Sequence, residues 1–173
     1  EEARAFLNTA KAAGPQMAAL FSLALESCAR KSELLGIRWS DLDPNFHLRH
    51  SVYYDWGAYC RMRFLRENGL DAHVMHSLQV GPVIFREECL FRKEILFGDV
   101  VTIDLELLSA RSDYSRWTLK HTIYKGEGNI AAVLTLEGAW IDTARRKLTA
   151  PPSAGINAFS AIPKAAGFID MQP

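Results

Sequence analysis

Hydrophobic residues recur with a helical period at the start of the chain. Residues 1–13 and 16–35 are rich in Ala, Leu, Glu, Lys and Arg, with one break at Gly14-Pro15, because proline can begin a helix but cannot continue one. This pattern predicts two N-terminal helices. A short extended run is expected over residues 36–41, before the next helix.

The next apolar run predicts one long central helix. Ser51 is placed to cap its start, and Asn68-Gly69 follows Glu67, where the helical pattern ends. Apolar and aromatic side chains between Val52 and Leu65 lie on most sides of this helix. A helix that is apolar nearly all round is usually buried, so we expect it in the core.

After Asn68-Gly69 the period changes from helical to strand-like. Apolar and polar residues alternate in segments joined by short turns at Ser112-Asp113 and Gly126-Glu127-Gly128, which suit antiparallel hairpins. The predicted strands are residues 82–97, 99–108, 115–125 and 129–142. The residues after Pro151-Pro152 are predicted to form a tail that lies over the surface. One buried helix followed by antiparallel strands indicates an α+β fold.

Composition limits the partners of this chain. Its 173 residues are about half apolar, enough for one sizeable core, and 20 Lys and Arg balance 20 Asp and Glu. Without excess charge the chain does not attract nucleic acid or an anionic membrane over long range, so small molecules or other proteins are the expected partners. The apolar segment at residues 17–25 is far too short to span a bilayer.

The cysteines bear on metal binding and on the compartment. Cys28, Cys60 and Cys89 are odd in number, far apart and without a CxxC spacing. This pattern argues against a disulfide framework and against a zinc site, so we expect a cytoplasmic protein without a metal.

Candidate chemistry is concentrated in the segment DLDPNFHLRHSVYY, residues 41–54. Two carboxylates, an amide and two imidazoles stand directly before the central helix. The N–H groups in the first turn of a helix are unpaired by geometry and carry a partial positive charge, so a carbonyl oxygen bound there would be polarised. The segment therefore combines an acid, a base and a place for developing negative charge.

Within this segment Asp43, Pro44, Asn45, His47 and Tyr53 resemble the pattern D-x-N-x-H-x-N-N-x-x-Y. That pattern is typical of plant-type fatty acyl-ACP thioesterases and of bacterial acyl-CoA thioesterases in the 4-hydroxybenzoyl-CoA thioesterase superfamily. Three further segments are similar to strands of this family, namely FREECLF (85–91), FGDVVTI (97–103) and WIDTARRKLTAPP (140–152).

This resemblance implies a hotdog fold, in which a long antiparallel sheet wraps around one buried central helix. The hotdog domain is expected at residues 33–152, after an N-terminal helical extension at 1–32 and before a C-terminal tail at 153–173. The chain departs from the family pattern at two places: Phe46 stands where many members have Gly, and Arg49-His50 replaces a pair of Asn.

The resemblance also implies catalytic roles for Asp43, Asn45, His47 and Glu88. Asp43 attacks the thioester carbonyl carbon directly or through a water molecule, and Asn45 holds that water or the oxyanion. His47 exchanges a proton with Glu88.

Three residues near the helix start are candidates for binding the substrate. His50 falls where some relatives have their histidine, and Tyr53 and Tyr54 are placed to line an acyl pocket. His50 is equally suited to capping or packing, and aromatic residues on a buried helix are most often simply core.

Other candidates have structural alternatives. Asp43 before Pro44 is also a common turn, in which the carboxylate accepts hydrogen bonds from nearby amides, and Asp41 is best explained this way. Adjacent strand residues point to opposite faces, so only one of Glu88 and Cys89 can face the loop; the resemblance favours Glu88, with Cys89 in the core.

Two further clusters give weaker signals. A metal site built from Asp43, His47, His50 and Asp55 lacks a defined ligand spacing. The basic triplet at residues 145–147 could bind a coenzyme A phosphate, although such a triplet more often keeps a strand end soluble.

The sequence thus predicts a cytoplasmic acyl-thioester hydrolase of fatty acid metabolism without a cofactor. Its substrate is expected to be an acyl-CoA or an acyl-carrier protein. The resemblance implies a homodimer or homotetramer with active sites at the subunit interface, where Glu88 can come from the partner chain. Two alternatives stay open: a hotdog hydratase or dehydratase, and a non-catalytic acyl-CoA-binding regulator in which the N-terminal helices bind a partner or DNA.

Overall fold

The computed structural model describes residues 39–172 of the chain. The chain divides into two compact units. Among the described residues, the loop unit comprises 39–48 and 96–98, and the sheet unit comprises 49–95 and 99–172. The predicted helices at 1–13 and 16–35, together with Cys28, lie outside the described residues.

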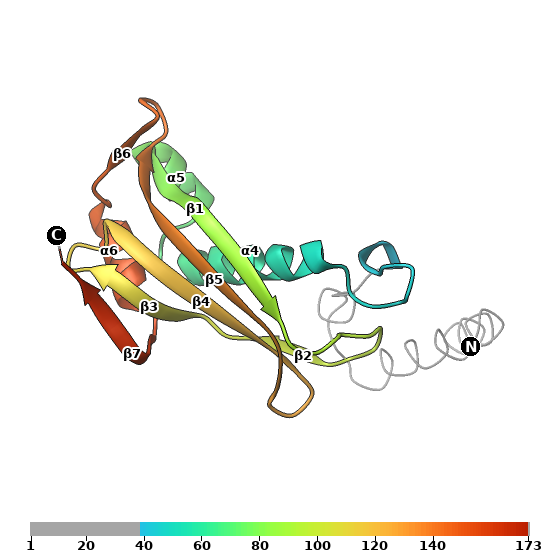
Figure 1. The fold of residues 1–173 in the computed structure, drawn as a ribbon. Helices are drawn as coiled ribbons and strands as arrows, with labels where there is room; N and C mark the ends of the chain where they lie inside the picture. Colours follow the sequence, from blue (N-terminus) through green and yellow to red (C-terminus); the bar gives the residue numbers. More distant parts are fainter. Residues whose placement is uncertain (1–38, 173) are drawn as a thin grey trace, which may run out of the picture. The chain divides into compact units, whose positions relative to one another are not determined.

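The sheet unit contains a seven-stranded sheet in the order β1-β5-β4-β3-β7, with β2 paired to β4 and β6 paired to β5 (Figure 1). Its strands are β1 (Val80–Phe91), β2 (Val101–Ile103), β3 (Glu106–Arg111), β4 (Arg116–Lys125), β5 (Asn129–Asp142), β6 (Lys147–Thr149) and β7 (Lys164–Met171). Every pairing is antiparallel except that of β3 with β7, which is parallel. Within the described chain β1 pairs only with β5, so it is an edge strand.

The predicted strands at 115–125 and 129–142 are confirmed by β4 and β5, which form the expected hairpin. The strand predicted at 82–97 ends earlier, at Phe91. The strand predicted at 99–108 is interrupted at Asp104-Leu105, and the two pieces, β2 and β3, pair with different parts of β4. At the interruption, Asp104 O accepts a hydrogen bond from the side chain of His121 in β4 instead of from a backbone N–H of the sheet.

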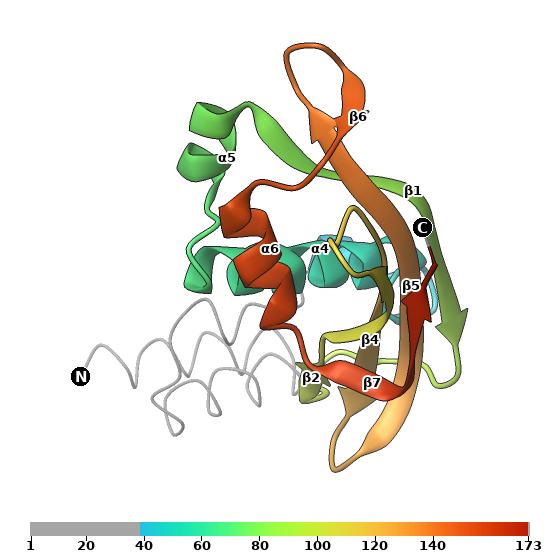
Figure 2. The ribbon, with the colours of Figure 1, turned by 90° about the vertical axis from the view of Figure 1, so that its left-hand side faces the viewer.

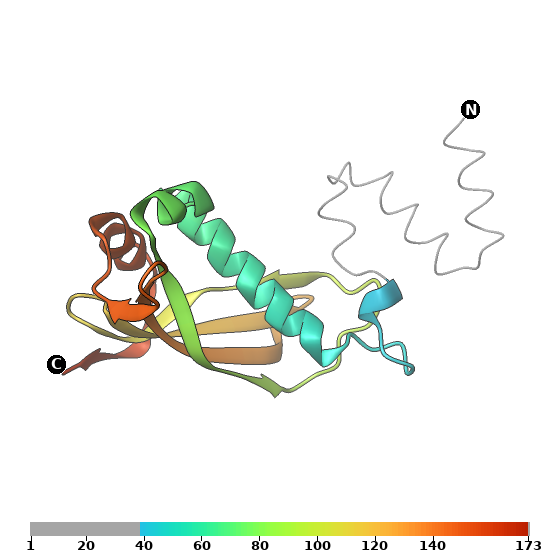
Figure 3. The same cartoon turned by 90° about the horizontal axis from the view of Figure 1, so that it is seen from above.

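The central helix is α4 (His50–Glu67), which runs beside β1 across one face of the sheet (Figure 3). It ends at the predicted residue. Its buried residues are Val52, Tyr53, Gly57 and Leu65, and they form one stripe. Tyr59 on another side is 66% exposed, so the prediction of burial on most sides is wrong: the sheet covers only one face of α4.

The cap predicted at Ser51 is also wrong. Ser51 lies inside the first turn of α4, and Arg49, the N-cap residue, forms no side-chain hydrogen bond to the helix. A shorter helix that the sequence analysis missed, α5 (Ala72–Leu78), does have such a cap, because Val74 N–H donates to Asp71 Oδ1 at 2.8 Å.

Residues 153–171 are not a tail lying over the surface. They form α6 (Ser153–Ser160) and β7, which adds a parallel strand beside β3. Phe159 of α6 is 2% exposed and lies between Trp117 and Trp140, with ring centroids 5.2 Å from each. Helices α4, α5 and α6 all lie on the same side of the sheet (Figure 2). This C-terminal segment therefore completes the core.

The loop unit begins with a 3-10 helix at Trp39–Asp41, so the extended run predicted over residues 36–41 is wrong for these three residues. Leu42 and Leu48 then pair in an antiparallel bridge that closes a tight loop. The sheet unit by itself has the predicted α+β arrangement, with one long helix held against a sheet that is antiparallel except for β7, and this arrangement confirms the expected hotdog fold. The predicted domain boundaries stay a prediction.

Candidate functional site

Asp43 organises the loop between Leu42 and Leu48. Its Oδ1 accepts the backbone N–H groups of Asn45, at 2.8 Å, and His47, at 3.0 Å. Within residues 39–172 its Oδ2 forms no hydrogen bond. Oδ1 therefore has the turn-forming role foreseen as an alternative for this carboxylate. Any catalytic role must use Oδ2.

Phe46 gives this loop its shape. Its N–H donates to Asp43 O at 3.0 Å, and its φ is 64°, in the left-handed region that favours glycine. The replacement of the family's Gly by Phe46 thus leaves the glycine-like backbone in place and adds an aromatic ring that is 64% exposed. Asn45 is exposed beside it, and His47 pairs through its backbone with Leu96.

The start of α4 is open at its backbone. His50 is exposed at the first helical position. Within residues 39–172 the N-cap residue Arg49 forms no side-chain hydrogen bond to the first turn, where Val52 N–H donates to Arg49 O at 3.0 Å. These groups therefore keep the partial positive charge of a helix N-terminus.

Tyr53 lies in the core, 3% exposed, with its ring edge-on to Phe91 of β1 at 5.0 Å between centroids. Burial raises the pKa of the Tyr53 phenol. Tyr54 is half-buried beside it, and burial raises its pKa as well. Tyr53 thus packs as a core residue, and Tyr54 is the more accessible of the two phenols.

The two neighbouring glutamates of β1 lie on opposite faces of the sheet. Glu88 is exposed and pairs with Arg86, with Arg86 Nη2 and Glu88 Oε2 2.6 Å apart. Glu87 instead faces α4, where its Oε1 lies 3.0 Å from Nη1 of Arg61. Within one protomer the structure therefore does not bring Glu88 to the start of α4; the carboxylate on that face is Glu87, which the sequence analysis missed.

Cys89 shares the helix-facing side with Glu87. Burial raises the pKa of its thiol to about 11, and the nearby Glu87 carboxylate acts in the same direction. The thiolate form is therefore rare at neutral pH, and Cys89 is no nucleophile in this environment.

Arg61 connects Glu87 to a buried histidine. The side chains of Arg61 and Glu87 are 11% and 20% exposed, and burial lowers the pKa of the Arg61 guanidinium while Glu87 opposes that change. His121 Nδ1 lies 2.9 Å from Asp104 O, a carbonyl that can only accept, so Nδ1 carries the proton. Nε2 then accepts from Arg61 Nη1 at 3.2 Å. Arg61 lies four residues from both Gly57 and Leu65, which are buried on one face of α4. A charged residue on this face was the sequence signal for the network.

The stability of the fold is expected to depend on pH through His121. Burial first, and the charge of Arg61 second, lower its pKa from 6.5 to about 4, and the residue is fully buried. Between these values the unfolded chain binds a proton that the folded chain does not, so stability falls as the pH falls. From pH 7 to 4.5 the unfolding free energy should drop by about 2 kcal/mol more in the parent protein than in His121→Gln. Denaturant unfolding at each pH measures this, and parallel pH profiles would contradict it.

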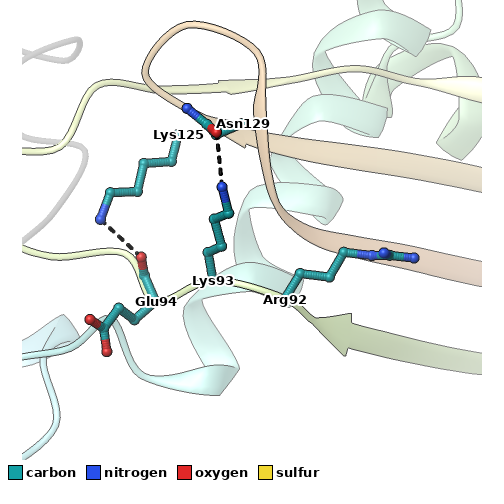
Figure 4. Close-up of a pocket in the computed structure, with 5 residues that line it drawn as sticks. All are labelled: Arg92, Lys93, Glu94, Lys125 and Asn129. Carbon is teal, nitrogen blue, oxygen red and sulfur yellow. Dashed lines mark hydrogen bonds between the residues drawn. The ribbon is translucent and has the colours of Figure 1, made fainter.

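A basic hollow of about 490 Å³ lies at the end of β1 (Figure 4). It is lined by Arg92, Lys93, Glu94, Lys125 and Asn129. Lys93 Nζ donates to the neutral amide oxygen of Asn129 at 2.8 Å, whereas Lys125 is paired with Asp99 at 2.9 Å. The guanidinium of Arg92 has no partner within the described chain. Arg92 and Lys93 therefore keep positive charge that no carboxylate in residues 39–172 pairs with.

This basic hollow is close to the start of α4. Arg92 directly follows Phe91, whose ring packs on Tyr53 in the first turn of the helix. Sequence analysis missed Arg92 and Lys93 because only the triplet at 145–147 stood out in the linear charge pattern.

Metal ligands are not clustered in the described part of the chain, where no three His, Cys, Asp or Glu side chains come together in a way that could hold an ion. No described helix is long and apolar enough to cross a membrane.

Comparisons with known proteins agree with this fold. A family model described as the thioesterase-like superfamily matches residues 37–160. A hypothetical protein from Staphylococcus aureus, solved in complex with CoA, has a TM-score of 0.66 at 22% identity over 72% of this chain and 77% of that one. A gentisyl-coenzyme A thioesterase gives 0.61 at 23% identity, over 72% and 95%. A 1,4-dihydroxy-2-naphthoyl-CoA thioesterase from Synechocystis gives 0.64 at 14%, over 72% and 91%. No curated protein sequence matches the chain.

Proposed function

The chain belongs to the thioesterase-like superfamily and is a thioester hydrolase, and from this premise we propose that its substrates are acyl-CoA esters. The observation that carries the proposal is the basic hollow beside the open start of α4. A CoA ester joins a polarisable thioester carbonyl to a carrier that ends in phosphates, so it needs a place for developing negative charge and cations for the phosphates.

Arg92 and Lys93 are suited to the phosphates of CoA. A guanidinium can donate two parallel hydrogen bonds to phosphate, and an ammonium attracts it as a point charge. Three cations (Arg92, Lys93 and Lys125) and two carboxylates (Glu94 and Asp99) lie around the hollow. The excess positive charge is local, in a chain whose formal net charge is zero.

For the hydrolytic step we propose the roles that the family resemblance implies for the loop and for the helix start. The first-turn N–H groups of α4 stabilise the oxyanion that forms when the thioester carbonyl is attacked. Asp43 supplies the attacking carboxylate or draws a proton from the attacking water, and Asn45 and His47 orient that water and move its proton. The C–S bond then breaks, giving a carboxylic acid and the CoA thiol. Hydrolysis adds one water and needs no cofactor.

The decisive experiment mixes the protein with acyl-CoAs of several chain lengths and with acyl-carrier protein, in the presence of a thiol-detecting dye. Thiol release from acyl-CoA supports the proposal. Thiol release from acyl-carrier protein alone would mean that the substrate's carrier is acyl-carrier protein and not CoA. Binding of acyl-CoA without thiol release would indicate a regulator. Consumption of an enoyl-CoA double bond without thiol release would indicate a hydratase.

The double variant Arg92→Ala/Lys93→Ala is expected to raise KM for acyl-CoA about tenfold, because it removes charge-assisted contacts to phosphate. KM for the same acyl group on N-acetylcysteamine, which has no phosphate, should stay unchanged. Arg145→Ala/Lys147→Ala serves as the matched control, since it removes an equal charge from the exposed basic triplet. An equal KM change on both carriers, or the same change in the control, would contradict the role of the hollow.

A second copy of the chain is expected to pair along β1, giving the homodimer. β1 is a 12-residue edge strand, and Phe85 and Leu90 on it are 53% and 57% exposed. Long apolar edges of this kind favour pairing with another strand. Sedimentation equilibrium should find a dimer at micromolar concentration, and a fully active monomer would overturn this assembly. A contribution of Glu88 from the partner chain remains a prediction.

A further inference from the structure

Phe46 lies at the tip of a small hairpin in the loop unit. Asp43 N–H donates to His47 O at 2.8 Å, so residues 44–46 form a three-residue connection between the two arms. Phe46 is the last residue of this connection, and its φ of 64° is left-handed. Three-residue hairpin loops commonly have a left-handed residue at this position, and it is usually glycine because a side chain is crowded there.

The hairpin is held by hydrogen bonds rather than by the phenyl ring of Phe46. Phe46 N–H donates to Asp43 O, and the Asp43 carboxylate accepts two further backbone N–H groups of the loop. Phe46 itself is 64% exposed. A bulky residue in the left-handed region is strained, and here burial of the ring does not offset the strain. Local strain that the fold does not require points to a functional role.

The hairpin keeps this ring close to the carboxylate that is proposed to act on the thioester. The hydrogen bond from Phe46 N–H to Asp43 O, 3.0 Å long, closes a four-residue turn. In such a turn the Cα atoms of the first and last residues are less than about 7 Å apart. Both residues belong to the loop unit. When the carbonyl carbon of a substrate lies within reach of Asp43 Oδ2, its neighbouring atoms are therefore within reach of the Phe46 ring.

The chemistry of the ring favours the acyl chain over the carrier. On one side of a thioester carbonyl lies the acyl chain, and on the other side the sulfur leads to the amides and phosphates of CoA. A phenyl ring offers apolar surface without a charge or a strong hydrogen-bonding group, so it stabilises an apolar chain more than a polar carrier. The cations of the basic hollow, Arg92 and Lys93, suit the phosphate end.

We infer that the exposed ring of Phe46 contacts the apolar acyl chain beside the thioester and makes the protein prefer longer acyl groups. This inference rests on the proposed role of Asp43 in thioester hydrolysis. Phe46 selects the substrate and takes no part in the bond changes. Because the contact exists before and during the reaction, its loss should raise KM and leave kcat nearly unchanged.

The kinetic test compares Phe46→Gly with the parent protein on octanoyl-CoA and acetyl-CoA. Glycine removes the ring but suits the left-handed backbone, so the melting temperature should not fall. KM for octanoyl-CoA should rise about tenfold, and KM for acetyl-CoA less than about twofold, because an acetyl group has little apolar surface for the ring to cover. KM for octanoyl-N-acetylcysteamine should rise as much as that for octanoyl-CoA, since the contact is on the acyl side.

Two control variants test whether the ring itself is responsible. Phe46→Leu keeps an apolar side chain and should hold KM for octanoyl-CoA within about threefold of the parent value. Tyr59→Ala removes another aromatic ring of similar exposure, 66%, from α4 and should change neither KM. Equal KM changes for both acyl groups, a change confined to CoA esters, or an altered oligomeric state of Phe46→Gly in sedimentation would overturn the inference.

A binding measurement separates this inference from the proposed function. S-octyl-CoA and S-ethyl-CoA are thioethers that cannot be hydrolysed, so calorimetric titration gives their Kd without turnover. Phe46→Gly should bind S-octyl-CoA about tenfold more weakly than the parent, and S-ethyl-CoA less than about twofold more weakly. Equal Kd values for S-octyl-CoA, or no binding to the parent, overturn the inference. Absence of thiol release from every acyl-CoA refutes the proposed function instead.

Discussion

Replacing Asp43 with Asn is expected to lower kcat about 100- to 10,000-fold, the range typical for loss of a general base. The side chain of Asn keeps an oxygen at the position of Oδ1. It can therefore still accept the N–H groups of Asn45 and His47, which lie 2.8 and 3.0 Å from that oxygen. What the substitution removes is the negative charge, so turnover should fall while the loop keeps its shape. Steady-state thiol release together with thermal unfolding measures both effects.

Two further variants make this test specific. Asp43→Ala removes the acceptor as well as the charge, and should add a loss of loop stability to the loss of turnover. Asp41→Asn neutralises the neighbouring carboxylate, which accepts a hydrogen bond from Ser40 Oγ at 3.3 Å. This variant should leave kcat within about twofold because Asp41 has no role in the proposed reaction. A near-normal kcat in Asp43→Asn would reduce Asp43 to a turn residue and leave the hydrolase without its proposed carboxylate.

The parts of the fold that the sequence predicted best are those set by local patterns. β4 and β5 alternate apolar and polar residues and are joined by a turn with two glycines, Gly126 and Gly128, both at positive φ. The end of α4 at Glu67 was equally clear, because Asn68 and Gly69 follow it. Such signals lie within a few residues of the structure that they determine.

The C-terminal elements could not be predicted in this way. β7 pairs in parallel with β3, more than fifty residues earlier in the chain, and α6 is buried by contacts of Phe159 with two tryptophans of other strands. Both depend on distant partners, and the short run around Pro151-Pro152 resembles a surface segment when read alone. Long-range packing decided their structure.

The site stays a prediction. The sequence named Asp43 and the helix start as candidates, but it could not decide which glutamate of β1 faces α4. That choice depends on the phase of the strand, and the pairing of β1 with β5 shifts register between Ile84 and Arg86. One extra residue in a strand moves every following side chain to the other face. Glu87, rather than Glu88, thereby reaches Arg61.

Replacing Arg61 with Met is expected to lower the unfolding free energy by about 3 kcal/mol. Met fills similar space but removes the cation, so the Glu87 carboxylate, 20% exposed, loses the charge that lies 3.0 Å away. His121 Nε2 loses its donor in the same step. Breaking a buried ion pair from one side costs more than the pair itself contributes, because a charge is left in an apolar setting. Urea unfolding at fixed protein concentration measures the change.

The neighbouring pair on the outer face provides the control for this prediction. Arg86 and Glu88 are 63% and 57% exposed, so Arg86→Met should change the unfolding free energy by no more than about 1 kcal/mol. Adding Glu87→Gln to Arg61→Met removes the stranded charge and should restore more than about 1 kcal/mol of the loss. If Arg61→Met is no more destabilising than Arg86→Met, or if Glu87→Gln restores nothing, the pair does not hold α4 to the sheet. The difference between two adjacent glutamates would then need a cause other than the face on which each one lies.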